Sequence, residues 1–76
     1  MTRDDLERAA RTYDEAAAQL ERALGHCRVA AERFRAGEVP SGTAHAWAAH
    51  GHLVAAAQHL DDQAHEHTKH ALLPDD

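Results

Sequence analysis

Cysteine, aromatic residues and long apolar runs are all scarce in this sequence, and each shortage excludes a class of protein. Cys27 is the only cysteine, which excludes an intramolecular disulfide scaffold. No apolar run approaches the ~20 residues that a transmembrane helix needs. One tryptophan, one tyrosine and one phenylalanine occur among 76 residues, a length that suits one small domain. A chain of this size is too short to enclose a large substrate cavity.

Basic charge is scarce as well, above all in the second half of the chain. The formal net charge is −5, from 8 basic and 13 acidic residues. Residues 39–76 hold one lysine against five acidic residues. Nucleic-acid binding depends on clustered lysine and arginine side chains that neutralise phosphates. We therefore expect no nucleic-acid partner.

The beginning of the sequence has no feature of an export signal. Residues 1–5 contain one arginine and two aspartates, whereas a secretory signal begins with a basic segment that leads into an apolar stretch. A single unpaired cysteine is also typical of a reducing compartment. These features predict a cytoplasmic protein with no membrane partner.

Alanine and histidine, by contrast, are in excess, with 18 and 8 residues. Alanine has the highest helix propensity, and turn-forming residues cluster between two long alanine-rich segments. Thr2 and Asp5 form a candidate N-terminal capping pair, and Gly37 is a candidate C-terminal cap. The sequence predicts one all-α domain over 1–76, an antiparallel hairpin with a helix over 3–36, a turn over 37–42, a helix over 43–72 and a short acidic tail over 73–76.

Apolar residues recur every seven positions in both predicted helices. The first helix carries a series of larger residues and a series of alanines: Leu6, Tyr13, Leu20, Cys27 and Phe34, then Ala9, Ala16, Ala23 and Ala30. The second helix carries a matching pair of series: Ala46, Leu53, Leu60 and His67, then Ala57, Ala64 and Ala71. A seven-residue repeat is typical of coiled coils, so we predict that these series face each other in an alanine-rich coiled coil.

The position of the turn predicts the register of this coiled coil. Residues that face each other in an antiparallel hairpin centred near residue 40 have numbers that add up to about 80. Tyr13 then faces His67, and Ala23 faces Ala57. Cys27 faces Leu53 and is expected to be a small buried side chain.

A lone hairpin of this composition lacks a sufficient core. A seam of mostly alanine buries little apolar area, whereas ordering the chain costs roughly 1.5 kcal/mol per residue. Exposed tryptophan often anchors a partner. We therefore predict a homodimer that forms a four-helix bundle, with a helix of another protein as the alternative partner. The predicted contact residues are the apolar ones that lie off the seam: Trp47, Val54, Leu24 and Val29.

The histidines suggest two alternative functions. Metal ligands that lie on one helix are spaced by three or four residues. Candidate ligands with such spacings occur only in a group near the C-terminus: His65, His67, His70, Asp62 and Glu66. This group would make the protein a zinc- or nickel-binding one, with the site completed across a dimer. A separate stripe, His45, His52 and His59, recurs every seven residues. If the stripe lines an interface, protonation of these histidines as the pH falls from about 7 to 5.5 would place like charges in that interface and loosen the assembly. The protein would then form a pH-responsive assembly.

No catalytic pattern accompanies these features. The sequence has no glycine-rich phosphate loop and no Ser-His-Asp arrangement. His26 is adjacent to Cys27, but the two side chains leave a helix about 100° apart, so the histidine does not activate the thiol. We expect neither enzymatic activity nor a cofactor. The sequence predicts a small protein–protein interaction module that acts as an adaptor, a regulator or an assembly factor.

Overall fold

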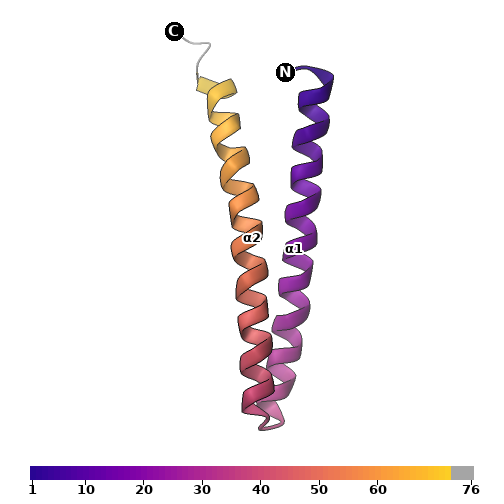
Figure 1. The fold of residues 1–76 in the computed structure, drawn as a ribbon, viewed down its shortest axis with the longest axis vertical. Helices are drawn as coiled ribbons and strands as arrows, with labels where there is room; N and C mark the ends of the chain where they lie inside the picture. The colour runs from indigo at the N-terminus through magenta and orange to yellow at the C-terminus, as the bar shows by residue number, and fades with distance from the viewer. Residues whose placement is uncertain (73–76) are drawn as a thin grey trace.

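Two long antiparallel helices pack side by side in the computed structural model, which describes residues 1–72 and the side chains of residues 1–69 (Figure 1). Helix α1 spans Arg3–Arg35 and helix α2 spans Val39–Leu72. The hairpin measures 58 × 23 × 13 Å, so it is a single layer of two helices. This confirms the predicted helical hairpin, while the predicted tail over 73–76 lies outside the described residues. Neither helix is both long and apolar enough to cross a membrane within residues 1–72.

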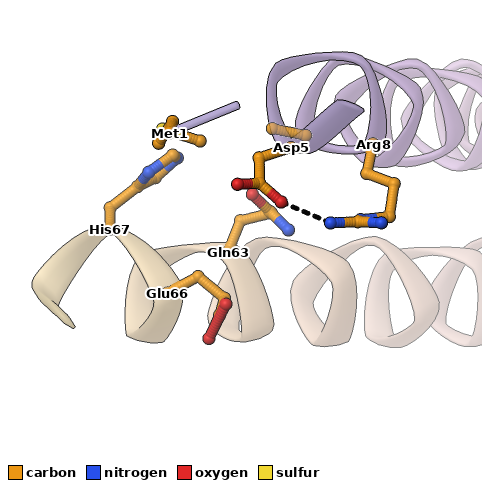
Figure 2. Close-up of a pocket in the computed structure, with 7 residues that line it drawn as sticks. Met1, Asp5, Arg8, Gln63, Glu66 and His67 are labelled. Carbon is orange, nitrogen blue, oxygen red and sulfur yellow. Dashed lines mark hydrogen bonds and ion pairs between the residues drawn. The ribbon is translucent and has the colours of Figure 1, made fainter. Parts of the chain in front are cut away.

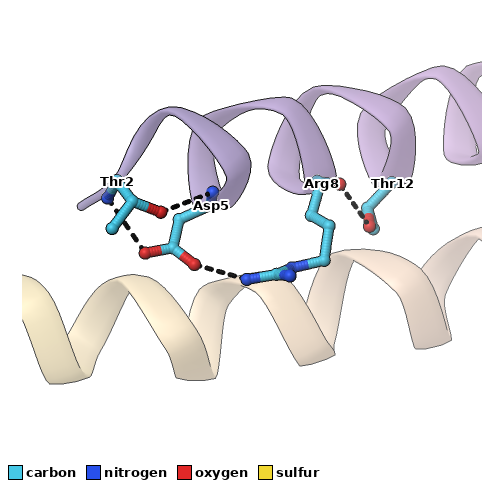
Figure 3. Close-up of polar contacts among 4 residues, drawn as sticks. All are labelled: Thr2, Asp5, Arg8 and Thr12. Carbon is cyan, nitrogen blue, oxygen red and sulfur yellow. Dashed lines mark hydrogen bonds and ion pairs between the residues drawn. The ribbon is translucent and has the colours of Figure 1, made fainter.

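The predicted capping pair forms the start of α1 (Figure 3). The Asp5 N–H donates to Thr2 Oγ1 at 3.1 Å, and the Thr2 N–H donates to Asp5 Oδ2 at 3.0 Å. These two bonds make a complete capping box. Arg8 pairs with the other carboxylate oxygen of Asp5. The hydrogen bonds from Thr2, followed by the charge of Arg8, hold the pKa of the Asp5 carboxyl below its ordinary value.

Gly37 ends α1, as predicted. Its φ of +78° lies in the left-handed region, which costs glycine little because it has no Cβ. The Gly37 N–H donates to the Phe34 carbonyl at 3.0 Å, and the Glu38 N–H donates to the Arg33 carbonyl at 2.8 Å. The two bonds form a Schellman motif, which satisfies carbonyls at the helix end.

The turn is shorter than the sequence analysis predicts. α2 begins at Val39, four residues before the predicted start at residue 43. Pro40 therefore lies in the first helical turn rather than in the loop. Proline is well accepted there, because the first N–H groups of a helix have no partner within the helix. Residues 39–42, although rich in turn-forming residue types, thus form the first turn of α2.

The buried hydrophobic residues of the described chain are all alanines. They are at most 9% exposed: Ala16, Ala23, Ala30, Ala49 and Ala56. This result confirms Ala16, Ala23 and Ala30 of the alanine series predicted for the first helix, whereas Ala9 is half-buried. The predicted seam of the second helix is wrong, because Ala57 and Ala64 are exposed and the row that faces α1 begins one residue earlier in each repeat.

Side-chain size explains the position of α2. Gly42, Ala49 and Ala56 are buried and recur every seven residues, so this row presents little side-chain volume to α1. Helices that meet through such small residues approach at the low end of the usual range of about 8–10 Å. A seam containing Leu53 and Leu60 would hold the two backbones further apart. The small row therefore faces α1, and the leucines lie at the edge of the contact.

The two helices lie closest together near the turn and diverge toward the chain ends (Figure 1). The small row of α2 continues there with Gln63, a longer side chain that is half-buried. Tyr13 Oη and His67 Nε2 share a hydrogen bond of 2.8 Å at this wider end, and their rings are nearly parallel with centroids 6.0 Å apart. The predicted pairing of these two residues is confirmed.

The alanine row separates two different faces of the layer. The apolar face carries larger side chains that are 39–51% exposed: Leu6, Tyr13, Leu20, Phe34, Leu53 and Leu60. Cys27 belongs to the same series and is exposed, so the expectation that it is buried is wrong. The polar face carries half-buried side chains that flank the alanines on the other side: Asp5, Thr12, Gln19, His26, His45, His52 and His59.

Replacing Ala56 by leucine should destabilise the hairpin. The Ala56 side chain is 0% exposed, so a leucine would force the helices apart at a cost of about 2 kcal/mol. Ala44→Leu is the matched control, because Ala44 is exposed on the same helix and its replacement should change stability by at most about 0.5 kcal/mol. Chemical denaturation of both variants measures the difference. Equal stabilities would contradict the observed seam.

Acid should weaken the start of α1 through Asp5. The folded-state pKa of Asp5 is lowered, so its contribution to stability is present above the ordinary value of 3.8 and is lost as the pH falls through the lowered one. Asp5→Asn has no such titration. The stability difference between wild type and Asp5→Asn should therefore shrink when denaturation is compared at about pH 6 and about pH 3. A difference that stays constant would show that the Asp5 charge contributes nothing.

Candidate functional site

The apolar face is hollowed along the middle of the hairpin, between residues 20–30 of α1 and 46–53 of α2. The hollow has a volume of about 520 Å³ and is lined by alanines of both helices, by larger apolar side chains and by one histidine: Ala23, Ala30, Ala46, Ala49, Leu20, Leu24, Cys27, Leu53 and His50. The buried alanines form its floor, because they leave the backbones close and their neighbours stand above them. An apolar hollow of this kind can hold side chains of a partner.

A second hollow continues the apolar face to the turn. It measures about 350 Å³ and is lined by Phe34, Thr43, Ala46, Trp47 and His50. The Phe34 ring lies against Gly42, where an added Cβ would come within 2.9 Å of it, so the glycine is needed for this contact. Trp47 is 70% exposed, and its ring meets the His50 ring edge-on with centroids 6.0 Å apart. Both hollows are free of Asp, Glu, Lys and Arg.

The four predicted contact residues do not form one surface. Leu24 and Trp47 line the two hollows of the apolar face. Val54 is 42% exposed but lines neither hollow. Val29 is half-buried and lies one turn from His26, on the side of α1 that carries the polar face.

Leu20 and Leu53 belong to the apolar face although their heptad spacing predicts that both lie in the seam, since leucines at that spacing are usually buried in a coiled coil. They instead stand 42% and 51% exposed on the apolar face. The sequence feature that could have indicated this exposure is the series of alanines at the same heptad spacing, because alanines can form a complete seam without the leucines.

A cluster of imidazoles lies on the polar face. His26 of α1 and His45 of α2 are joined by a hydrogen bond between their Nδ1 atoms at 3.0 Å. The His52 ring stacks on the His26 ring, with centroids 5.5 Å apart and planes 8° apart. His52 Nδ1 is 2.7 Å from Gln19 Oε1. All four side chains are half-buried between the helices.

The predicted histidine stripe thus faces α1 of the same chain. His45, His52 and His59 are half-buried along the contact between the helices. They lie on the face opposite to the leucines, so they do not line the hollows described above. Loosening of an assembly in acid remains a prediction.

The predicted C-terminal metal group is spread over several sides of α2. His67 is bonded to Tyr13, and Glu66 Oε2 is 2.9 Å from Lys69 Nζ. Asp62 and His65 are exposed, and the side chain of His70 lies outside the described residues. Within residues 1–69, no three His, Cys, Asp or Glu side chains are arranged to hold one metal ion.

A small polar pocket lies at the open end of the hairpin (Figure 2). The Asp5–Arg8 pair of α1 lies there against Gln63 of α2, with further lining from Met1, Ala9, Glu66 and His67. Its volume is about 110 Å³. Sites for small molecules commonly measure about 300–1,000 Å³, so this pocket does not suit a substrate.

Comparisons with protein families, with curated proteins and with solved structures found no match for this chain. Two features of the described residues point to a function: an uncharged, hollowed apolar face and a group of imidazoles on the opposite face.

Proposed function

We propose that the protein is a small interaction module whose apolar face binds a second copy of the chain to make a four-helix bundle. The observation that carries this proposal is the exposure of the large apolar residues, while the buried hydrophobic residues are alanines. Alanine burial alone offsets little of the entropy lost on folding. A partner that covers the leucines supplies the missing apolar burial.

The surface area of the chain supports a partner of standard size. A compact protein of 8.3 kDa is expected to expose about 4,600 Å². This hairpin exposes 5631 Å², which is about 1,000 Å² more. A stable protein–protein interface removes about 800 Å² from each partner. Covering the apolar face would therefore remove the excess.

The shape of the apolar face favours a second copy as the partner. Its floor is made of alanines, and leucines such as Leu20, Leu24 and Leu53 stand beside that floor. In a two-fold contact, the leucines of one copy can lie over the alanines of the other, because both patches are present on every copy. The hollows contain no charged residue that would need a partner of opposite charge.

The bundle would be suited to binding roles rather than to catalysis. Pairing the apolar faces leaves two polar faces exposed on one rigid body. Such a body can act as an adaptor, a regulator or an assembly factor in the cytoplasm. A helix from another protein is the alternative occupant of the apolar face, and the experiment below separates the two.

Leu53→Glu should break the dimer, and Val54→Glu should not. These neighbours are 51% and 42% exposed in the single chain, but only Leu53 lines the apolar hollow. A glutamate at position 53 would bury an unpaired charge in the bundle, at a cost of several kcal/mol. Light scattering after size exclusion measures the mass of each variant, and circular dichroism measures its helix content.

The wild-type protein supplies the control for loss of folding in Leu53→Glu. If dimerisation and folding are coupled, the wild-type melting temperature rises with protein concentration. A wild-type monomer with a constant melting temperature would contradict the proposal and leave the apolar face to another protein. Equal loss of mass in both glutamate variants would also contradict it.

Trp47→Ala should weaken the dimer. Trp47 is 70% exposed beside the hollow at the turn, and buried tryptophans are frequent hot spots that contribute about 2 kcal/mol or more. That energy corresponds to a dissociation constant raised about thirtyfold or more. Sedimentation equilibrium measures it, with Val54→Ala as the control, because Val54 is an exposed apolar residue of the same helix that lines neither hollow. An unchanged constant would place Trp47 outside the interface.

A further inference from the structure

The His26–His45 contact has the spacing of two ligands of one metal ion. Zinc and related ions bind imidazole nitrogens at about 2.0–2.1 Å, so two such ligands lie about 3.0–3.4 Å apart around one ion. The Nδ1 atoms of His26 and His45 are 3.0 Å apart. In the metal-free protein at least one of these nitrogens must accept the shared proton, because two N–H groups cannot bond to each other.

The surroundings hold the two imidazoles in this arrangement. The His52 ring stacks on the His26 ring, which fixes its plane. The oxygen of Gln19 can only accept a hydrogen bond, so His52 Nδ1 carries the proton in their 2.7 Å contact. His52 is therefore held by Gln19 while it supports His26.

The charged groups around the pair are few and face water. Gln19 is neutral, and Arg22, one helical turn before His26, is exposed. The next basic residue along the polar row of α1 is Arg33, whose Nη1 is 3.6 Å from Glu38 Oε2. His26, His45 and His52 are half-buried, which limits competition from water while leaving a route for an ion. Imidazole ligands suit zinc, nickel and copper, whereas magnesium prefers oxygen ligands.

We propose that His26 and His45 form a two-histidine site for a divalent transition-metal ion, which bridges α1 and α2 near the turn. The ion replaces the shared proton, and water or other ligands complete its coordination. His52 is a positioning residue, because no three-ligand group exists within residues 1–69. The site lies on the polar face, so it does not depend on pairing of the apolar faces.

Metal binding to the site should stabilise the hairpin. The two ligands are 19 residues apart in the sequence and come together only in the folded chain, so the ion binds the folded state preferentially. Nickel titrated into the untagged, metal-free full-length protein should raise its melting temperature, and magnesium should not. Acidification should remove the effect, because protonated imidazoles do not bind metal.

Single substitutions identify the ligands. His26→Ala and His45→Ala should each weaken nickel binding at least tenfold by calorimetry. His59→Ala is the matched control, since His59 belongs to the same half-buried row but lies two helical turns, roughly 10 Å, beyond His52. Unchanged affinity in both ligand variants would overturn the proposal. Loss of binding only after joint replacement of His65, His67 and His70 would assign the metal to the C-terminal group and would overturn it as well.

A measurement on the wild type keeps the test valid if a variant fails to fold. Nitrogen-15 spectra of the imidazole rings should show that zinc perturbs Nδ1 of His26 and of His45 and leaves the His59 ring unchanged. Perturbation confined to other histidines would overturn the proposal. This result is independent of the dimer, because the ring signals report ligation whether or not the apolar faces are paired.

Discussion

Close contact between small residues along the middle of the hairpin decides where all other side chains lie. Ala23 and Ala30 of α1 and Gly42, Ala49 and Ala56 of α2 are buried where the two helices pack together, so small residues occupy the middle of the contact. Larger residues must therefore flank the contact on one side or the other. Leucines and aromatics flank it on one side, and histidines and other polar residues flank it on the opposite side. Both proposed binding surfaces follow from this single steric constraint.

The two surfaces differ in what each still needs. On the polar face, the clustered histidines bond to each other or to Gln19 within the chain. On the apolar face, leucine and tryptophan side chains remain in contact with water, a state that a second copy would relieve. In the proposed bundle the apolar faces turn inward and the polar faces outward. His26 and His45 would then stay accessible to ions from solvent, so the two functions are compatible on one layer of helices.

The helices, their caps and their register are predictable from the sequence, but the rotation of α2 is not. The Thr2 hydroxyl can cap the start of a helix, and Gly37 can adopt the positive φ that often ends one. The position of the turn is enough to pair Tyr13 with His67. Alanine, by contrast, is suited to both buried and exposed helix positions, so the pattern does not choose between Ala56 and Ala57. The leucines favoured the wrong choice. Because of this one-residue difference, the histidine cluster and the apolar hollow could not be predicted.

The antiparallel pairing also determines the order in which contacts can form as the chain folds. Phe34 and Gly42 are eight positions apart in the sequence, whereas Tyr13 and His67 are 54 apart. The entropy cost of closing a loop grows with its length, so contacts beside the turn form at the lowest cost. Each layer that forms shortens the loop that the next layer must close. Loop entropy therefore favours folding from the Gly37 turn toward the chain ends, with the Tyr13–His67 hydrogen bond among the last contacts to form.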